Sequence, residues 1–351
     1  MGYKNLVISK DATLIQALRQ MDETGKKMLL VFDRDRFYSI VTVGDIQRAI
    51  IKHIDFNETL SSIVKTVGLL YAYESDTKDI IKEKMLKIRA QLMPVLDEKG
   101  NLVEIYYWED FFPFDDLQNK RELIGLPVVI MAGGKGTRLR PITNVIPKPL
   151  IPIGEKTILE VIMDQFEGIG CHKFYMSVYY KADMMKFYID QLEHKYDIEF
   201  FMEDKPLGTI GSISLLKDKI ASPFFVSNCD SIIDQDYRDV FEYHMNNYND
   251  LTIVTMVKSF KIPYGVIETR EDGLMVNLKE KPELTYQLNT GVYVLNPELI
   301  KEIPEDQFFH ITDLMEKLKS RGGRVGCFPV SEGSWHDMGE WPEYLKMINV
   351  L

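Results

Sequence analysis

One short segment combines three features that bind phosphate. The segment VVIMAGGKGTRLRPITNVIPKPLIPIG begins with an apolar run, which predicts a buried strand over residues 128–131. Arg138 and Lys148 add two cations shortly afterwards. Between the strand and the cations, bare backbone lets amide groups approach phosphate oxygens. The glycines that supply it are Gly133, Gly134 and Gly136. The segment therefore predicts a loop that binds a polyanion, most simply a nucleoside triphosphate.

Two familiar phosphate loops do not fit this segment. The P-loop ends in Gly-Lys-Ser/Thr, whereas Gly136 is followed by Thr137 and Arg138. The dinucleotide fingerprint needs a third glycine, and Leu139 stands at that position. The pattern indicates a phosphate loop of another kind.

Two lysines precede prolines. Lys148 lies between two prolines, and Lys281 precedes Pro282. A residue before proline is biased toward extended backbone, so we expect both lysines to be aimed from stiff extended segments on separate strands. Two such cations would suit two phosphate groups, although a single lysine of this kind is more often an ordinary surface residue.

Two aspartates end short apolar segments. Asp230 closes SPFFVSNCD, and Asp337 lies in SWHDMGE. A carboxylate at the carboxyl end of a strand faces the ligand crevice of an open α/β sheet. Mg²⁺ in nucleotide enzymes takes one or two carboxylates together with phosphate oxygens and water. We therefore predict that Asp230 and Asp337 bind Mg²⁺, the alternative being two turn aspartates.

Composition limits the remaining possibilities. The 351 residues carry a net charge of −11, of which −2 falls on residues 1–125 and −9 on residues 126–351. Nucleic-acid binding needs a broad basic surface and is not expected. The three cysteines are far apart and form no CxxC pair, so neither a disulfide framework nor a zinc site is predicted. No apolar run suits a membrane span or a signal peptide, which makes the cytoplasm the default location.

The first third of the chain repeats itself. Residues 28–50 resemble residues 92–112, with Asp45 and Asp110 at equivalent positions. Further pairs at equivalent positions are Val31 and Val95, Asp33 and Asp97, and Ile40 and Ile105. Each copy predicts a β-α-β-β-α unit whose last helix opens on an Asp cap. The predicted divisions are 1–57 and 58–118 for the repeats, 119–125 for a linker, and 126–351 for the remainder.

The repeated unit resembles a pair of CBS domains. In that family a Thr or Ser followed three positions later by Asp binds the ribose and phosphate of an adenine nucleotide, a pattern that Thr42 and Asp45 match. The second copy keeps Asp110 but has Tyr107 and Trp108 nearby, where a hydroxyl and a small residue are expected. The alternative is that both aspartates only cap helices. CBS pairs commonly associate face to face, so the resemblance also implies a homo-oligomer.

The remainder of the chain resembles the sugar-1-phosphate nucleotidylyltransferases. The glycine loop is followed in order by EDKPLGTIGS, SNCD, YGVIE, EKP, NTGVY and WHDMG. The resemblance implies an α/β fold: a Rossmann-like mixed-sheet nucleotidyltransferase domain preceded by the tandem CBS pair. Cys229 stands where the family usually has glycine, which puts the orientation of Asp230 in question.

This resemblance also implies residue roles. Arg138 and Lys148 would hold the triphosphate, Asp230 and Asp337 would bind Mg²⁺, and Lys281 would hold the sugar phosphate. The nucleotide-binding residues would be Gly133, Gly134, Gly136, Thr137, Glu203, Gly208 and Gly211. The sugar-binding residues would be Gly265, Glu280, Asn289 and Thr290.

The implied reaction joins an NTP to a sugar 1-phosphate and releases pyrophosphate. FMEDKPLGTIGSI looks more like guanylyltransferase members, since Glu203 could accept from guanine donors. A CBS pair ahead of the domain resembles the glucosamine-1-phosphate guanylyltransferases of the bacterial legionaminic acid route, which implies GTP and glucosamine 1-phosphate. The alternatives are mannose or heptose 1-phosphate, or a glucose 1-phosphate enzyme that uses UTP or dTTP. In a different class, the chain would be an adenylate sensor with an inactive transferase domain.

Overall fold

The protein divides into two compact units, Met1–Arg121 and Glu122–Leu351. The computed structural model describes residues 4–67, 69, 71–88, 91–112, 121–192 and 196–350. We refer to the two parts as the N-terminal unit and the C-terminal unit. Within the predicted linker, residues 119 and 120 lie outside the described residues.

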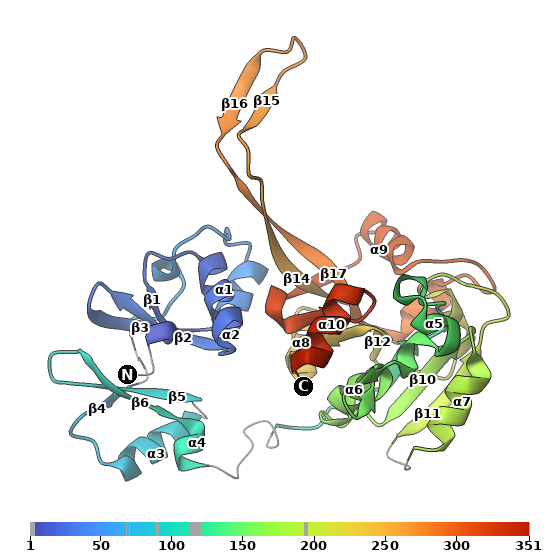
Figure 1. Cartoon of the computed structure of the whole chain (residues 1–351), viewed down its shortest axis with the longest axis horizontal. Coiled ribbons are helices and arrows are strands. Elements are labelled where there is room, and N and C mark those ends of the chain that lie inside the picture. The colour runs from blue at the N-terminus through green and yellow to red at the C-terminus, as the bar shows by residue number, and fades with distance from the viewer. Residues whose placement is uncertain are drawn as a thin grey trace. The chain divides into compact units, whose positions relative to one another are not determined.

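The N-terminal unit contains two copies of one arrangement (Figure 1). In each copy a three-stranded sheet has a parallel first pair and an antiparallel second pair. The first copy comprises β1 (Val7–Ser9), α1 (Leu14–Thr24), β2 (Met28–Asp33), β3 (Arg36–Thr42) and α2 (Val43–Ile51). The second comprises β4 (Ala72–Tyr73), α3 (Lys78–Ile88), β5 (Leu92–Leu96), β6 (Leu102–Tyr107) and α4 (Trp108–Phe111). The predicted β-α-β-β-α repeat is thus present in both copies.

The sequence-predicted Asp cap of α2 is wrong in detail. Thr42 is the N-cap, and its hydroxyl accepts a hydrogen bond from the amide of Asp45 at 3.2 Å. Asp45 reciprocates by accepting from the amide of Thr42 at 2.9 Å, which completes a capping box. Burial alone would raise the pKa of Asp45, but hydrogen bonds from Thr42 and Arg48 outweigh it and lower that pKa. Asp110 takes the same third helical position in α4.

The C-terminal unit is built on a seven-stranded sheet in the order β11-β10-β7-β12-β17-β14-β18. Only β17 runs antiparallel to its two neighbours, so the sheet is mixed. Its strands are β7 (Val128–Met131), β10 (Lys173–Val178), β11 (Asp197–Met202), β12 (Phe224–Asn228), β14 (Leu251–Lys261), β17 (Glu283–Leu295) and β18 (Val325–Val330). Short pairs add β8 (Pro152–Ile153) with β9 (Lys156–Thr157) and β13 (Ser231–Ile233) with β19 (Trp335–Asp337).

Alternate residues of the strands separate two apolar cores. Val128 and Ile130 face a cluster that includes residues of α6, α8 and α10, whereas Val129 faces a cluster with residues of α9. The helices of this unit are α5 (Ile142–Val145), α6 (Ile158–Glu167), α7 (Ala182–Asp190), α8 (Tyr237–Asn246), α9 (Ile311–Ser320) and α10 (Trp341–Val350). Because both faces are covered, β7 reads as the continuous apolar run that the sequence predicted.

The chain reverses its direction of travel across the sheet at β7. From β7 it proceeds to β10 and β11 on one side, and then returns to β12 on the other side. Ligands of open α/β sheets bind where the strand order reverses, outside the carboxyl ends of the strands. The glycine loop follows β7 and Asp230 follows β12, so both lie at this point. The predicted Rossmann-like mixed α/β fold is confirmed.

A two-stranded arm extends from the same sheet. The long strands β14 and β17 continue past it into β15 (Val266–Thr269) and β16 (Met275–Lys279), which pair with each other (Figure 1). Among the described residues, no helix is both long and apolar enough to cross a membrane.

Candidate active site

The glycine loop is held against the segment that carries Lys148. Gly136 has φ +60°, and an added Cβ would lie 2.9 Å from Thr143 and 3.0 Å from Cβ of Lys148. The Thr143 hydroxyl donates to the carbonyl of Gly136 at 2.9 Å. Glycine is therefore required here by both conformation and close approach, and the loop and Lys148 are positioned together.

A cavity of about 360 Å³ opens beside the loop. Its wall combines the end of β7, the glycine loop and the segment after β11. The lining residues are Met131, Gly133, Gly134, Lys135, Tyr179, Glu203, Pro206, Leu207, Gly208, Thr209, Asn228 and Phe308. Gly133, Gly134, Glu203 and Gly208 are thus brought together as the sequence predicted. Gly136 and Thr137 do not line this wall, and their contact with a nucleotide stays a prediction.

Glu203 lies buried at the back of this cavity with 7% of its surface exposed. One carboxylate oxygen accepts from the hydroxyl of Ser177 at 2.5 Å, and the other accepts from the amide of Leu207 at 3.2 Å. These bonds fix the carboxylate and leave lone pairs free, because each oxygen can accept more than one bond. The carboxylate of Glu203 is therefore held in place with acceptor capacity left, and its contact with a base stays a prediction.

Two cations and three acids meet outside the ends of β7 and β12. Lys148 contacts Asp230 directly, and both side chains are largely buried at 8% and 16% exposure. Arg138 lies 3.9 Å from Asp230, 3.6 Å from Asp337 and 2.7 Å from Glu340. β13 and β19 bring the acids together by pairing Ser231 with Asp337. The predicted set of Arg138, Lys148, Asp230 and Asp337 therefore converges.

The two aspartates form a donor set suited to a divalent cation. Burial raises the pKa of Asp337, and the nearby charge of Asp230 raises it further. The amide of Gly339 donates to Asp337 at 2.8 Å and fixes that carboxylate. Within the described ranges, no group of three metal-ligating side chains is found. Two carboxylates fit a cation whose remaining ligands are phosphate and water, as Mg²⁺ prefers.

A second cavity, of about 460 Å³, adjoins this cluster. It shares Thr209 and Asn228 with the first cavity. Its other lining residues are Arg138, Asp230, Ser231, Asn289, Thr290, Gly291, Tyr293, His310, Ile311, Thr312, Trp335 and Asp337. The predicted sugar residues Asn289 and Thr290 therefore face the same space as the acids.

Gly208 and Gly211 have a packing role that the sequence did not predict. An added Cβ on Gly208 would lie 2.5 Å from the carbonyl oxygen of Phe309, and one on Gly211 would lie 2.7 Å from that of Gln307. Backbone hydrogen bonds from Phe309 to Leu207 and from Ile210 to Phe309 join the two segments. Gly208 lines the first cavity, whereas Gly211 lines neither, so the base contact of Gly211 stays a prediction.

Lys281, Glu280 and Gly265 lie elsewhere. All three are exposed residues partway along the arm, between the paired strands β14 and β17 and the paired strands β15 and β16, and none lines either cavity. Glu280 approaches Gly265 closely, since an added Cβ there would lie 2.9 Å from its carboxylate. The structure therefore does not bring these three predicted site residues to the acid cluster.

The backbone predicted for the two pre-proline lysines is wrong. Lys281 has φ +43°, a left-handed conformation in the turn between β16 and β17. Lys148 begins a 3-10 helix, Lys148–Leu150, instead of lying on a strand. Pro147, which precedes Lys148, has the extended backbone that was expected of Lys148 itself.

Several lining residues were missed by the sequence reasoning. Phe308, which is 62% exposed, lines the first cavity, and His310 lines the second. Their rings meet edge to face at 4.7 Å, so one short segment contacts both cavities. Tyr179, Thr209 and Asn228 were also overlooked. Thr209 and Asn228 lie within the motifs EDKPLGTIGS and SNCD, which could have signalled them. Phe308 and His310 lie in no such motif, and the approach of Phe309 to Gly208 brings their segment to the site.

Cys229 is compatible with an unobstructed Asp230. The thiol is buried, with 8% of the residue exposed, and belongs to the apolar core beneath the sheet. Burial raises the pKa of Cys229 to about 12, so the thiol stays protonated at neutral pH. The departure from glycine therefore adds a packed side chain and no second charge.

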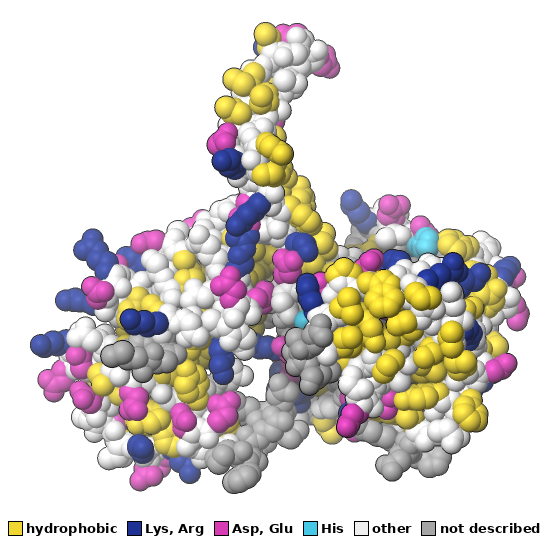
Figure 2. Space-filling model, in the orientation of Figure 1, with side chains coloured by type: hydrophobic (Ala, Val, Ile, Leu, Met, Phe, Trp, Pro, Cys, Tyr) yellow, Lys and Arg dark blue, Asp and Glu magenta, His cyan; other side chains and the backbone are white. Residues whose placement is uncertain are grey.

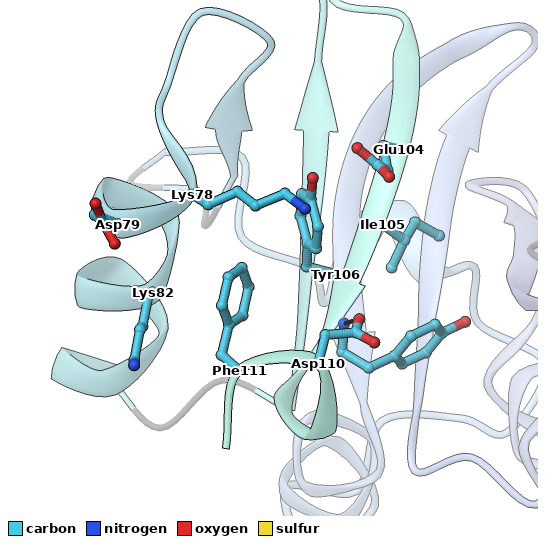
Figure 3. Close-up of a pocket in the computed structure, with 9 residues that line it drawn as sticks. Lys78, Asp79, Lys82, Glu104, Ile105, Tyr106, Asp110 and Phe111 are labelled. Carbon is cyan, nitrogen blue, oxygen red and sulfur yellow. Dashed lines mark hydrogen bonds between the residues drawn. The ribbon is translucent and has the colours of Figure 1, made fainter. Parts of the chain in front are cut away.

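The N-terminal unit has a cavity of its own, of about 740 Å³, in the second repeat (Figure 3). Lys78 lies over the ring of Tyr106 at 5.7 Å, and Tyr106 packs against Phe111 at 5.2 Å. Its charges are of both signs: Lys78 and Lys82, with Asp79, Glu104 and Asp110. This lining shows no preference for an anionic ligand.

Fold and site together define a class of protein. A mixed α/β sheet holds a glycine loop, two cations and paired carboxylates at the point where its strand order reverses, as a phosphate-transferring enzyme requires. A profile of the family described as nucleotidyl transferase matches residues 127–351, and a CBS domain profile matches residues 1–52. The chain belongs to the nucleotidyl transferase family.

Known proteins resemble the same part of the chain. The mannose-1-phosphate guanylyltransferase catalytic subunit beta of Drosophila pseudoobscura pseudoobscura is 34% identical over 186 residues, which cover 51% of this chain and 50% of that protein. The mannose-1-phosphate guanyltransferase of Emericella nidulans is 31% identical over 229 residues, which cover 63% of this chain and 62% of that protein. The match thus spans half to three fifths of these relatives.

Solved structures share the fold. The crystal structure of HddC from Yersinia pseudotuberculosis superposes with a TM-score of 0.50 at 29% identity, covering 64% of this chain and 99% of that one. A putative glucose-1-phosphate thymidylyltransferase from Bacillus anthracis has a TM-score of 0.50 at 20% identity, covering 64% and 94%, and supports the fold alone.

Proposed function

We propose that the protein is a sugar-1-phosphate guanylyltransferase, which transfers GMP from GTP to a sugar 1-phosphate and releases pyrophosphate. The observation that carries this proposal is the pair of adjoining cavities. One contains the glycine loop and Glu203, the other contains the two aspartates, and Arg138 and Lys148 lie at the acid cluster. The names of the two relatives favour guanylyl transfer.

The chemistry needs positioning more than proton transfer. A phosphate oxygen of the sugar 1-phosphate attacks the α-phosphorus of GTP, a new P–O bond forms, and the bond to pyrophosphate breaks. The nucleophile is already an anion, so no general base is required. Bringing two like charges to 4 Å costs about 4 kcal/mol at an effective dielectric of 20. Arg138 and Lys148 offset that repulsion and align the two phosphate groups.

The acids balance these cations before substrate binds. Lys148 contacts Asp230, and Arg138 contacts Glu340 at 2.7 Å. A divalent cation held by Asp230 and Asp337 would neutralise phosphate charge in the same place, and Mg²⁺ is the ion proposed. With such a cation bound, Lys148 and Arg138 would be able to face the phosphates without leaving Asp230 as an uncompensated buried charge.

Guanine is the proposed base because of Glu203. Its fixed carboxylate can accept from the two N–H donors on the Watson–Crick edge of guanine, which uracil and thymine cannot match. For the acceptor, we propose glucosamine 1-phosphate, supported by the CBS unit at the N-terminus. Glu280 lines neither cavity, so its contact with an ammonium group of the sugar stays a prediction. Mannose 1-phosphate is the competing acceptor, supported by the names of the two relatives.

A pyrophosphate-release assay with four NTPs and a panel of sugar 1-phosphates tests these choices. GTP with glucosamine 1-phosphate should give the highest kcat/KM. A preference for UTP or dTTP would reject the guanylyl choice, and a preference for mannose 1-phosphate would reject the amino sugar alone. Asp230→Asn should nearly abolish release, whereas Asp218→Asn, an exposed position outside both cavities, should not.

The sugar-phosphate role of Lys281 needs its own measurement. We propose that substrate draws this lysine toward the acid cluster, so Lys281→Ala should raise the KM for the sugar phosphate more than that for GTP. Lys279→Ala, two residues away on the arm, is the control and should leave both values near normal. An unchanged KM for the sugar phosphate in Lys281→Ala would remove Lys281 from the site.

For the N-terminal unit, we propose a regulatory or assembly role. Thr42 and Asp45 are the candidate contacts for an adenine nucleotide, although in the structure they bond to each other as a helix cap. Calorimetry of the full chain with AMP and ATP, repeated with Asp45→Asn, tests this. Binding that is unchanged in the variant, or absent from the parent, would contradict the nucleotide role. An adenylate sensor without catalysis would bind nucleotide and release no pyrophosphate.

A further inference from the structure

The strand β17 changes its surroundings where it enters the seven-stranded sheet. Residues 283–289 belong to the arm and are all at least partly exposed, whereas residues 290–295 are all buried. Apolar side chains lie on the surface of the arm in Figure 2; on β17 they include Leu284 and Tyr286. Asn289 is the last residue of the arm part, and it lines the second cavity. The join between arm and sheet therefore lies at the candidate site.

A β-bulge occupies this join. On β14 one residue separates the two positions that pair with Tyr293 and Asn289, whereas on β17 three residues, 290–292, separate those two partners. Gly291 has φ +86°, and an added Cβ would lie 2.3 Å from the side-chain nitrogen of Asn228. Bulges are common next to active sites, where they change the direction of a side chain. We infer that this bulge serves to direct Asn289.

Side chains hold the bulge in one geometry. The hydroxyl of Thr290 donates to the carbonyl of Val254 at 2.8 Å. The carbonyl of Thr290 accepts from the hydroxyl of Ser231 at 2.5 Å. Thr290 and Ser231 are both buried, and these bonds replace ladder bonds that the extra residues interrupt. The backbone that carries Asn289 is therefore fixed.

The carboxamide of Asn289 is fixed as well. Its oxygen accepts from the amide of Gly291 at 3.0 Å and from the hydroxyl of Tyr293 at 2.9 Å. These two bonds use both lone pairs of the oxygen, and because a backbone amide can only donate, they also establish which end of the carboxamide is the oxygen. Among the described residues, the amino group of Asn289 has no hydrogen-bond partner. This amino group is therefore the end that remains for a ligand in the second cavity.

Tyr293 is well placed to hold this carboxamide. It lies in the buried part of β17, pairs with Val226 and Ile253, and is 4% exposed. Burial raises the pKa of Tyr293 to about 12, so the hydroxyl stays protonated at neutral pH and can donate. The ring is fixed by the sheet, so the position of the hydroxyl is fixed with it.

We propose that Tyr293 is a positioning residue, whose hydroxyl holds Asn289 so that the amino group of Asn289 donates to the acceptor substrate. The inference rests on the proposed function, because it takes the second cavity to hold the sugar 1-phosphate. A donor at this point binds an oxygen of the acceptor, either a hydroxyl or the phosphate, and disfavours an ammonium group. The ammonium group of an amino sugar would therefore lie in another part of the cavity.

Kinetics of pyrophosphate release by the full chain test the role of Tyr293. Tyr293→Phe removes the hydroxyl and keeps the ring, so the KM for the sugar 1-phosphate should rise about 3- to 10-fold, as the loss of one hydrogen bond predicts. The KM for GTP and kcat should stay near those of the parent. Asn289→Ala should raise the KM for the sugar 1-phosphate at least as much. Because Tyr293 acts through Asn289, adding Tyr293→Phe to Asn289→Ala should cause no further rise.

Tyr175→Phe is the matched control. Tyr175 is buried in the same apolar core as Tyr293, but its hydroxyl bonds to the carbonyl of Lys219 and it lines neither cavity. This variant should keep both KM values of the parent, and circular dichroism establishes that each variant is folded. An unchanged KM for the sugar 1-phosphate in Tyr293→Phe would overturn the role of Tyr293, as would losses that multiply in the double variant. Either result would leave the proposed function standing, whereas a parent chain that is inactive with every sugar 1-phosphate would overturn both.

A second variant tests which group of the acceptor meets Asn289. Asn289→Asp replaces the amino group by a carboxylate oxygen of the same shape. The KM values for glucosamine 1-phosphate and glucose 1-phosphate should rise by similar factors, because the two sugars share the oxygens that would lose this donor. A lower KM for glucosamine 1-phosphate alone would place its ammonium group beside residue 289 and overturn the assignment of an oxygen there.

Discussion

Replacing Lys148 by methionine should lower both the stability and the activity of the C-terminal unit, by separable mechanisms. Lys148 and Asp230 are in contact at 8% and 16% exposure. Removing one partner of a buried ion pair costs about 3–5 kcal/mol, because the other charge is left uncompensated. Arg138, 3.9 Å from Asp230, compensates part of that charge and places the expected loss near 3 kcal/mol.

That loss corresponds to a measurable shift. For a unit of residues 122–351, each kcal/mol lowers Tm by about 2–4 °C, so Lys148→Met should melt roughly 6–12 °C below the parent. The matched control is Lys156→Met, whose lysine is 56% exposed and pairs with Asp164. Exposed ion pairs contribute less than about 1 kcal/mol, so this variant should melt within a few degrees of the parent.

Adding Asp230→Asn to Lys148→Met separates the two effects. With both charges gone, the double variant should recover most of the lost stability, to within about 1 kcal/mol of the parent. Activity should not recover, because in the proposed reaction Lys148 also holds the phosphates, where such a group contributes about 10²–10³ in kcat. Calorimetric melting and pyrophosphate release measure the two quantities on the same samples. Additive losses of Tm in the double variant, or a normal kcat in Lys148→Met, would refute the reasoning.

Three further predictions follow from single positions. Gly208→Ala should lower the free energy of unfolding in urea by about 1–3 kcal/mol more than Gly273→Ala does. Both glycines have positive φ (+84° and +80°), but only Gly208 lies against a backbone carbonyl, so equal losses would show that there is no clash. Phe308→Ala should raise the KM for GTP about 5- to 100-fold, as loss of base stacking predicts, while Phe187→Ala, on the exposed face of α7, should not. Burial lowers the pKa of His244 below its usual value of 6.5, so the unfolded chain binds this proton more readily than the folded chain, and the free energy of unfolding should fall as pH drops from 7 toward 5. His244→Gln should make the free energy of unfolding less dependent on pH in this range, and an unchanged dependence would contradict the prediction.

The sequence predicted the elements that local chemistry specifies. The strand Val128–Met131, the two β-α-β-β-α repeats and the glycine loop after that strand are visible as apolar runs, repeated spacing and glycine positions. Arg138, Lys148, Asp230 and Asp337 were identified by residue type and then found together. These features can be predicted because they depend on neighbouring residues in the sequence, or on the general rule that site residues lie at the carboxyl ends of strands in an α/β sheet.

The rest depends on contacts between distant segments. Phe308 and His310 enter the site only because Phe309 packs on Gly208. The left-handed turn at Lys281 comes from the join of two strands and overrides the extended preference before proline. The arm was not predicted, because strands β14 and β17 look like ordinary strands until their lengths are compared with those of their neighbours in the sheet.

The wall shared by the two cavities has a thermodynamic consequence. Thr209 and Asn228 line both cavities, so we expect a ligand that fixes these side chains in one cavity to change the affinity of the other cavity for its ligand. Linkage makes the effect mutual: the factor by which bound nucleotide alters sugar-phosphate affinity equals the factor by which sugar phosphate alters nucleotide affinity. If the proposed donor and acceptor bind in these two cavities, they should therefore bind cooperatively.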